Sequence, residues 1–417
     1  MLRFNLLATL FAAALTASAH AQKTWVIDQT IQPGVDFTVI QGAVLLSSPG
    51  DTILVKEGTY AQGISVNGKS LTIVGEGKVT VTAPASGNVS GAMIEVRNLS
   101  PDQRVFLNGI DVENDSIPKG PGVRIANCAG SVWFENSSVS VESGHAVSIH
   151  DSELVYLTGC VFRADRAILT ESGEEIGTNG LRISGDSEVQ ATLISAYGSS
   201  KTAFGGPMGI PLQGGSGLHI ANSRLHVLNG LFKGGSGTSD YVDGCLTPAN
   251  GGYGIECVEG DPAEHWVLLH EVETIKGATS AGGSFCNPVV PPPILAFFDP
   301  FDLVGSTGGI ARTLKSTADP SAGNVSFSMW GNSTDLYWIY ASKESFMPLP
   351  IPGVDTGLVL DPVQMFPVVQ GAKTDYSDSI DLPYSHPSPP VTVVAQALVI
   401  DSNLDVYLTN PSFAAFY

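Results

Sequence analysis

The sequence is poor in charge, and basic residues are the scarcest. Charged residues make up 14% of the chain, and 20 Lys and Arg face 40 Asp and Glu, which gives a formal net charge of −20. Contacts to nucleic-acid phosphates need clustered Lys and Arg, so this balance excludes a nucleic-acid partner from our expectations. It also disfavours anionic membranes and is typical of a soluble extracellular surface.

Cysteine is also rare, and its number is odd. The five residues are Cys128, Cys160, Cys245, Cys257 and Cys286, and no CxxC motif occurs. We therefore expect no metal site, and at most two disulfides can form. Cys245, Cys257 and Cys286 lie close together around Gly-rich loops, so we expect a bridge among these three. The sequence leaves the pairing open.

Long apolar runs are confined to the N-terminus. Arg3 precedes a mostly apolar run over residues 6–15, which is shorter than the roughly 20 residues needed to cross a bilayer. Ala19 and Ala21 are small residues at the two positions that a signal peptidase reads. We expect residues 1–21 to be a signal peptide and the protein to be secreted, to the extracellular space, the cell surface or the periplasm. No later segment is a transmembrane candidate.

Long amphipathic helices are missing as well. The chain contains 47 Gly and 26 Pro, which suits many short strands separated by tight turns. One short helix is an exception. We expect Asp36 to cap it, with Phe37, Ile40, Val44 and Leu45 on one face, where it would cover the first edge of the fold.

A short strand motif recurs along the chain. It reads apolar, any, apolar, any, and then Asn, Asp, Gly or Glu. Its copies begin at Ile94, Val123, Val147, Leu181, Leu218 and Ile255, at intervals of 29, 24, 34, 37 and 37 residues. A bare coil of three short strands needs roughly two dozen residues, within the range of stacked repeats. The longer intervals carry polar, Gly-rich loops at 170–180, 197–217 and 234–254.

These intervals predict a parallel β-helix. Alternate residues of each strand point inward, and one coil cannot bury them alone. Stacking would place Val123 on Val147 and Ile125 on Ile149, and each fully buried side chain of this kind contributes about 1.5–3 kcal/mol. The Asn or Asp after the strand tolerates the left-handed backbone that a bend requires. An antiparallel sandwich also shows alternation, but it offers no reason for the irregular intervals.

The N-terminal segments carry a resemblance to a known fold family. They are residues 37–41 (FTVIQ), 48–55 (SPGDTILV), 57–60 (EGTY) and 69–75 (KSLTIVG). They resemble the first coil of pectin-lyase-like right-handed β-helix proteins, a superfamily of pectate lyases, pectin methylesterases, polygalacturonases and proteins without known activity. The resemblance implies an all-β protein with a right-handed parallel β-helix, which we assign to residues 22–287.

A second unit follows a proline-rich break at residues 287–293. Residues 325–329 and 336–340 alternate as half-buried strands, and 393–400 and 404–408 form a hairpin around residues 401–403. We expect residues 288–417 to form a small antiparallel β-sandwich. The segments 347–350 and 396–401 resemble a C-terminal module of large secreted bacterial proteins.

The signals for catalysis are weak. In the enzymes of the superfamily, the resemblance implies catalytic groups on the outward face of one sheet. The chain has no Asp-Asp pair, and the nearest fragments to polygalacturonase motifs are Gly144-His145-Ala146 and Arg124-Ile125-Ala126. The two opposed carboxyls of a glycosidase are therefore not indicated. Outward strand positions include Arg124, Arg182 and His219, which we take as the candidate site residues, against the alternative of an ordinary solvated face.

These observations predict a non-catalytic secreted or surface protein. Its loops and one sheet face would bind a polysaccharide or another cell-surface component, without a cofactor. The alternative is a polysaccharide lyase that acts on a uronate-containing polymer, with an Arg as the base and calcium as the cation that pectate lyases need. A purely structural or adhesive role is a third interpretation.

Overall fold

A computed structural model of the 417-residue chain describes most of the β-rich part in detail. The described residues are 22–84, 91–114, 120–169, 175–200, 213–237, 240–242, 245–247, 251–258, 266–277, 295–297, 302–306, 312–319, 323–342, 345–349, 358–360, 365–383 and 391–416. The expected signal peptide over residues 1–21 lies outside them.

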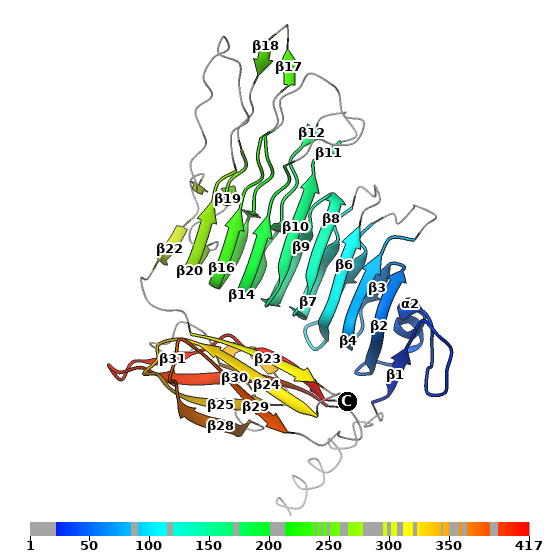
Figure 1. The fold of residues 1–417 in the computed structure, drawn as a ribbon, viewed down its shortest axis with the longest axis vertical. Coiled ribbons are helices and arrows are strands. Elements are labelled where there is room, and N and C mark those ends of the chain that lie inside the picture. Colours follow the sequence, from blue (N-terminus) through cyan, green and yellow to red (C-terminus); the bar gives the residue numbers. More distant parts are fainter. Residues whose placement is uncertain are drawn as a thin grey trace, which may run out of the picture.

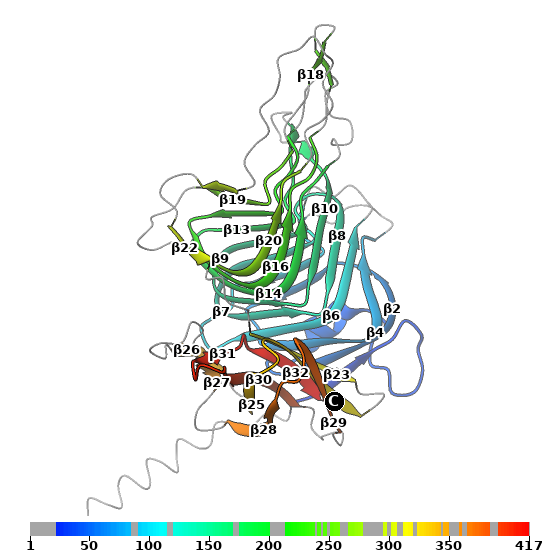
Figure 2. The same ribbon diagram turned by 60° about the vertical axis from the view of Figure 1, so that its left-hand side comes forward.

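The larger part of the chain is a right-handed parallel β-helix, as predicted (Figures 1 and 2). Ten of its strands are short: β1 (Thr24–Ile27), β3 (Ile64–Asn67), β5 (Ile94–Arg97), β8 (Ser138–Ser143), β10 (Val161–Arg166), β13 (Leu181–Ser184), β15 (Leu218–Ala221), β19 (Ile255–Val258), β21 (Leu295–Phe297) and β22 (Asp302–Ser306). Eight are longer: β2 (Thr52–Ala61), β4 (Leu71–Thr82), β6 (Arg104–Asn114), β7 (Val123–Glu135), β9 (Val147–Thr158), β14 (Ser187–Tyr197), β16 (Ser223–Lys233) and β20 (Trp266–Ile275). The longer strands turn a corner, so each coil contributes to three parallel sheets. We number the sheets in the order in which the chain visits them. The first sheet is the one that contains β3, β5 and β13.

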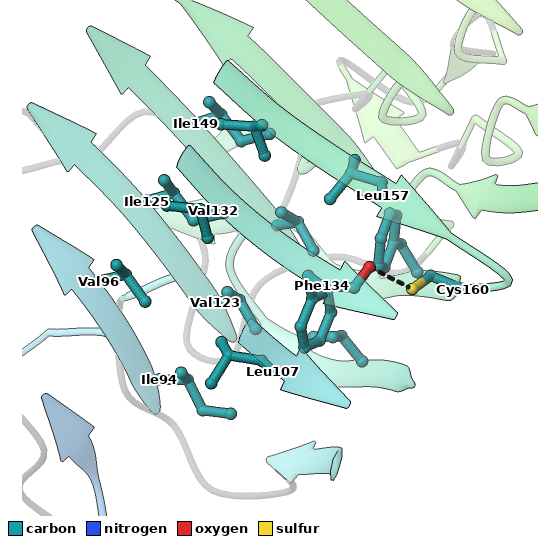
Figure 3. Close-up of a cluster of buried hydrophobic side chains, with 14 of the residues drawn as sticks. Ile94, Val96, Leu107, Val123, Ile125, Val132, Phe134, Ile149, Leu157 and Cys160 are labelled. Carbon is teal, nitrogen blue, oxygen red and sulfur yellow. Dashed lines mark hydrogen bonds between the residues drawn. The ribbon is translucent and has the colours of Figure 1, made fainter. Parts of the chain in front are cut away.

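The predicted stacking of like residues is present. Val123 pairs with Val147 and Ile125 with Ile149 in parallel register, and all four side chains are fully buried. The column continues from Ile149 to Ile183 and Ile220 on the next two coils. Figure 3 shows part of this interior, where aliphatic side chains of successive coils fill the space between the sheets. One apolar core therefore runs through the stacked coils from Ile27 to Leu269.

Two rows of left-handed residues make the corners of the coil. The row after the first sheet was predicted: Asn98, Asn127, Asp151, Gly185 and Asn222 all have φ between 45° and 59°. A second row, between the second and third sheets, was not: Gly109, Asn136, Gly159, Leu193, Asn229 and Glu271 have φ between 50° and 67°. Leu and Glu are uncommon in this conformation, so the stacked neighbours must impose it there.

The Gly-rich loops all leave the rod at the third corner, between the third sheet and the first. Their outgoing and returning limbs interleave in one backbone ladder that runs from Thr178 through Ser199, Gly215, Gly235 and Gly252 to Gly277, with N–H···O distances of 2.7–2.9 Å. A Cβ on Gly235 would lie 1.8 Å from the carbonyl oxygen of Ser199. Glycine is therefore required by the close approach of the strands. Beyond the ladder the antiparallel pair β17 (Asp240–Val242) and β18 (Cys245–Thr247) lies far from the coils (Figure 1), while β11 (Ile168–Leu169) and β12 (Glu175–Ile176) form a similar pair.

The expected N-terminal helix exists, but its cap was predicted wrongly. Helix α2 (Ile40–Leu46) begins after Val39, which gives no side-chain cap. Asp36 instead accepts a hydrogen bond from the backbone of Val26, at 2.9 Å, and so holds the first strand. Ile40 and Val44 are buried, as predicted, and help to cover the first coil, whereas Leu45 is 70% exposed.

The bridge expected among Cys245, Cys257 and Cys286 does not include Cys257. Cys257 is an unbridged thiol, fully buried on the inner face of β19, and burial raises its pKa to about 12. Cys128 and Cys160 are likewise free and buried. Of the three expected partners, Cys286 and the side chain of Cys245 lie outside the described part of the chain.

The boundary predicted after residue 287 falls one coil too early. Strand β21 pairs in parallel with β19, and β22 pairs in parallel with β20. The rod therefore extends to Ser306, and the module begins at about Arg312. The proline-rich break at residues 287–293 lies outside the described residues.

The module is an antiparallel sandwich, as predicted. One sheet contains β23 (Thr313–Asp319), β24 (Asn324–Trp330) and β29 (Ser377–Pro383). The other contains β25 (Leu336–Ser342), β28 (Phe366–Ala372), β30 (Val391–Ile400), β31 (Val406–Leu408) and β32 (Ser412–Phe416). A small hairpin, β26 (Ser345–Leu349) with β27 (Leu358–Leu360), completes the module. Phe327, Ile339 and Val399 lie in the core of the module.

The module lies along the outer face of the second sheet of the rod (Figure 1). Phe106, Trp133 and Tyr156 occupy register-paired outward positions there, and the rings of Trp133 and Tyr156 are stacked 4.0 Å apart. Phe413 of β32 packs edge-on against Phe106, with ring centroids 4.8 Å apart. This aromatic contact joins the two units into one body.

A buried carboxyl group lies beside these rings. Glu135 is fully buried and accepts hydrogen bonds from Ser412 Oγ and the backbone N–H of Phe413, at 3.2 and 3.3 Å. Burial raises its pKa well above the ordinary value, although the two hydrogen bonds and the charge of Lys315 lower it in part. The docked state therefore favours the neutral acid.

Truncation in the aliphatic column should destabilise the rod. We expect Ile149→Ala to lower the free energy of unfolding by about 2–5 kcal/mol, because it removes three carbons from a fully buried site. Ile31 is 89% exposed, and Ile31→Ala should change stability by less than about 0.5 kcal/mol. Denaturant unfolding followed by circular dichroism measures both, and equal effects would contradict the stacked core.

Glu135 should make the docking of the module depend on pH. Its folded pKa lies above the unfolded value of 4.5, so the stabilisation is complete below pH 4.5 and declines as the pH rises through the folded pKa. Each pH unit within that window costs about 1.4 kcal/mol. Glu135→Gln, which cannot ionise, should flatten this part of the stability curve. A curve of unchanged slope, measured by thermal unfolding across the pH range, would refute the assignment.

Candidate functional site

The outward face of the first sheet carries a continuous row of polar side chains. It contains Glu95, Arg124, Ser148, Arg182, His219 and Glu256, one from each of six consecutive coils, and each is paired in register with the next. We call these six residues the outer row. Parallel strands lie about 4.8 Å apart, so the row presents a polar group at each such step. The predicted site residues Arg124, Arg182 and His219 all belong to it.

The members of the outer row differ in their local partners. Arg124 lies between Glu95, whose carboxylate is 3.9 Å from the guanidinium, and Ser148. Arg182 pairs with Ser148 on one side and with His219 on the other. Arg124 and Arg182 are thus separated by one coil, and the structure brings Arg182 and His219 together but leaves Arg124 apart from them.

A second polar row lies next to the first, just before the strands begin. His145, Asn179 and Ser216 each stand two residues ahead of a first-sheet strand, and we call them the buried polar row. The backbone N–H of Asn179 donates to His145 Nδ1 at 3.0 Å, and that of Ser216 donates to Asn179 Oδ1 at 2.9 Å. Asn179 and Ser216 are buried, with exposed fractions of 6% and 2%. The row is held rigidly by these bonds.

Two contacts connect the rows. Ser216 Oγ donates to Glu256 Oε2 at 2.5 Å, and His145 Nε2 lies 3.3 Å from Arg182 Nη1. Burial lowers the pKa of His145 to about 3, and the positive charge of Arg182 and the proximity of His219 lower it further in the same direction. The imidazole of His145 is therefore neutral at every physiological pH.

The backbone N–H of Asn179 sets the tautomer of neutral His145. A backbone N–H only donates, so Nδ1 must carry the lone pair and Nε2 the proton. The guanidinium of Arg182 also only donates. Two donors, Nε2–H and Nη1–H, therefore stand 3.3 Å apart at the edge of the sheet. An oxygen atom that approaches this pair from solvent can accept from both.

Sequence reasoning identified only one of the two rows. The outer row follows from the period of the strand, but the buried polar row was missed, although the fragment around His145 was noted. A signal existed: in the coils of β9, β13 and β15, a polar residue is followed by Ala146, Gly180 or Gly217 and then by the strand. The small residue leaves room for the polar side chain to pack against the next coil.

The site shows no arrangement typical of metal chemistry. Within the described ranges, no three His, Cys, Asp or Glu side chains gather in a way that could hold a metal ion. The described part of the chain also contains no helix that is long and apolar enough to span a membrane.

Comparisons with known proteins give only distant similarities. No protein-family model matches the chain, and none of the curated proteins matches it. Among solved structures, it is similar to pectin methylesterase PemA from Erwinia chrysanthemi, with 11% identity, a TM-score of 0.33, and 62% of this chain and 90% of that one covered. A pectin methylesterase in complex with a hexasaccharide gives 12% identity, a TM-score of 0.33 and the same coverage. Tailspike protein 2 of bacteriophage CBA120 gives 10% identity and a TM-score of 0.27, over 90% of this chain and 73% of that one. At such values, an interpretation of function must come from the residues of this chain.

The neutral state of His145 can be observed directly. In NMR spectra of histidine-labelled protein, we expect its ring signals to stay in the neutral form until the pH falls to about 3. Arg182→Gln should raise this pKa, because it removes a neighbouring positive charge. Because the unfolded histidine titrates at the ordinary value of 6.5, the folded state should lose stability as the pH falls below that point, and His145→Gln should remove this slope. Titration of His145 near 6.5 would contradict the geometry.

Proposed function

We propose that the protein is a secreted, non-catalytic glycan-binding rod. Its first sheet would bind a polysaccharide, or a glycan on a cell surface, along the outer row. The observation that carries this proposal is the contact between His145 Nε2 and Arg182 Nη1, 3.3 Å apart, beside a row of polar groups. Sugars offer hydroxyl, ring and carboxylate oxygens, and these are acceptors for such a pair.

The arrangement also suits binding because it is already ordered. The bonds between the two rows fix His145, Asn179, Ser216 and Glu256 before any ligand arrives. A preorganised site loses less side-chain entropy on binding, which favours affinity. Arg182 is exposed and His219 is half-buried, so a ligand can reach both.

A polysaccharide lyase is the competing interpretation. Arg182 beside His219 would offer a base, and this adjacency is the observation in its favour. Against it, a guanidinium is a donor only, whereas a base must first give up its proton. We therefore place binding ahead of cleavage.

Binding and cleavage can be separated with two variants. We expect Arg182→Ala to weaken the affinity for a recognised glycan about 10- to 100-fold, since hydrogen bonds to charged groups contribute about 1.5–3 kcal/mol. Arg97 lies at the end of β5 but outside the outer row, so Arg97→Ala should change the affinity for the glycan little. Isothermal titration calorimetry on oligosaccharide ligands, identified first on a glycan array, measures both.

The same protein should be assayed on polyuronates with and without calcium. New ultraviolet absorbance from unsaturated products, abolished by Arg182→Ala, would overturn the proposal in favour of a lyase. No binding to any glycan on the array would also overturn it and would leave a structural role. Circular dichroism should confirm that each variant folds.

A further inference from the structure

A second cluster of polar residues lies on the third sheet, away from the outer row. Arg163 of β10, Tyr197 of β14 and Lys233 of β16 are register partners on three successive coils. They border a pocket with a volume of about 260 Å³, which is also lined by Ala164, Asp165, Gly198, Ser200 and Gly234. We infer that this pocket is a binding site for a saccharide that carries a carboxylate or sulfate group.

The floor of the pocket is rigid backbone. Gly198 N–H donates to the carbonyl of Lys233 at 2.9 Å, and Ser200 N–H donates to that of Asp165 at 3.2 Å. A Cβ on Gly198 would lie 2.0 Å from the carbonyl oxygen of Gly215, and one on Gly234 would lie equally close to the carbonyl of Gly252. The floor therefore belongs to the glycine ladder and exists before a ligand binds.

The walls supply the chemistry for an anion. The guanidinium of Arg163 lies over the ring of Tyr197, 4.9 Å from its centroid. Stacking on an aromatic ring orients the planar guanidinium while its N–H edge stays available for a bidentate contact with an oxyanion. Lys233 brings a second positive charge from a strand two positions away, and the backbones of these strands lie about 9–10 Å apart. In the part of the chain that the structure describes, neither cation forms an ion pair with a carboxylate.

Asp165 restricts the ligand further. Asp165 lines the same pocket, so a ligand meets one acidic residue beside two basic ones. A saccharide suits this mixed lining because its hydroxyls can both donate and accept, while its anionic group contacts Arg163 or Lys233. The residues thus fit an acidic sugar better than inorganic phosphate or a nucleotide.

The overall charge of the protein makes the cluster more specific. With a formal net charge of −20, the chain repels polyanions at long range, and only a local group of cations can hold one. The site shares with the proposed function the premise of a glycan ligand, but it uses different residues on a different sheet. Substitutions in the pocket and in the outer row can therefore be tested independently.

The test is a binding experiment on the full chain with three probes. These are a sulfated disaccharide, a trimer of hexuronate and a neutral trisaccharide, each titrated by calorimetry at low and moderate salt. We expect at least one anionic probe to bind, and Arg163→Ala/Lys233→Ala to weaken that binding at least tenfold. The two anionic probes distinguish a sulfate from a carboxylate. Any binding of the neutral trisaccharide should be the same in the double variant and the unchanged protein.

Control variants separate this site from the outer row. Lys78→Ala removes a cation of β4 that pairs with Glu113 at 3.9 Å, and it should leave affinity unchanged. Arg182→Ala should spare binding in the pocket. If only Arg182→Ala weakens binding of the anionic probes, the inference is overturned and the proposed function stands. Equal affinities of the double variant and the unchanged protein, or no binding of either anionic probe, would also overturn it.

Discussion

The parallel stacking of aliphatic side chains is the interaction on which everything else depends. No coil of this chain has an interior of its own: Val123 and Ile125 are shielded from water only because Val147 and Ile149 lie above them. The same register that aligns inward residues also aligns outward ones. A row of six polar groups on one sheet and a trio of Arg, Tyr and Lys on another are therefore direct consequences of core packing. The core thus decides which side chains can act together.

The sequence predicted those features that repeat with the strand. The alternation, the first row of bends and the membership of the outer row all follow from one short motif, because side chains in a strand alternate with period two. The second row of bends could not be predicted in this way. Leu193 and Glu271 adopt left-handed backbone there because Asn229 and Gly159 do so on neighbouring coils, and local preference yields to the stack. Asp36 was assigned to the wrong partner for a similar reason, since a carboxylate near a helix start can equally bind a strand backbone.

The docking of the module shows a different limit. An outward strand position is normally polar, but Trp133 and Tyr156 are apolar outward residues. Trp133 lies between the inward residues Val132 and Phe134, and Tyr156 follows the inward residue Val155. A continuous apolar run in a strand indicates burial on both faces. The run was visible in the sequence, but what covers it was not, because Phe413, which contacts Trp133, lies 280 residues further along. Such long-range contacts leave no periodic signal in either segment.

The surfaces of the rod are therefore divided among separate tasks. The second sheet is covered by the module, and the third corner is occupied by the glycine ladder and the loops that leave from it. Among the described residues, the outer row of the first sheet and the Arg163 pocket on the third lie outside these covered regions. Both carry the few cations of a strongly acidic chain in fixed positions, Arg182 against His145 and Arg163 against Tyr197. In such a chain the scattered acidic residues keep polyanions away from the rest of the surface, so affinity for an acidic ligand should be confined to these two places. Added salt would weaken that long-range repulsion and the local attraction alike, because both act through the same screened field.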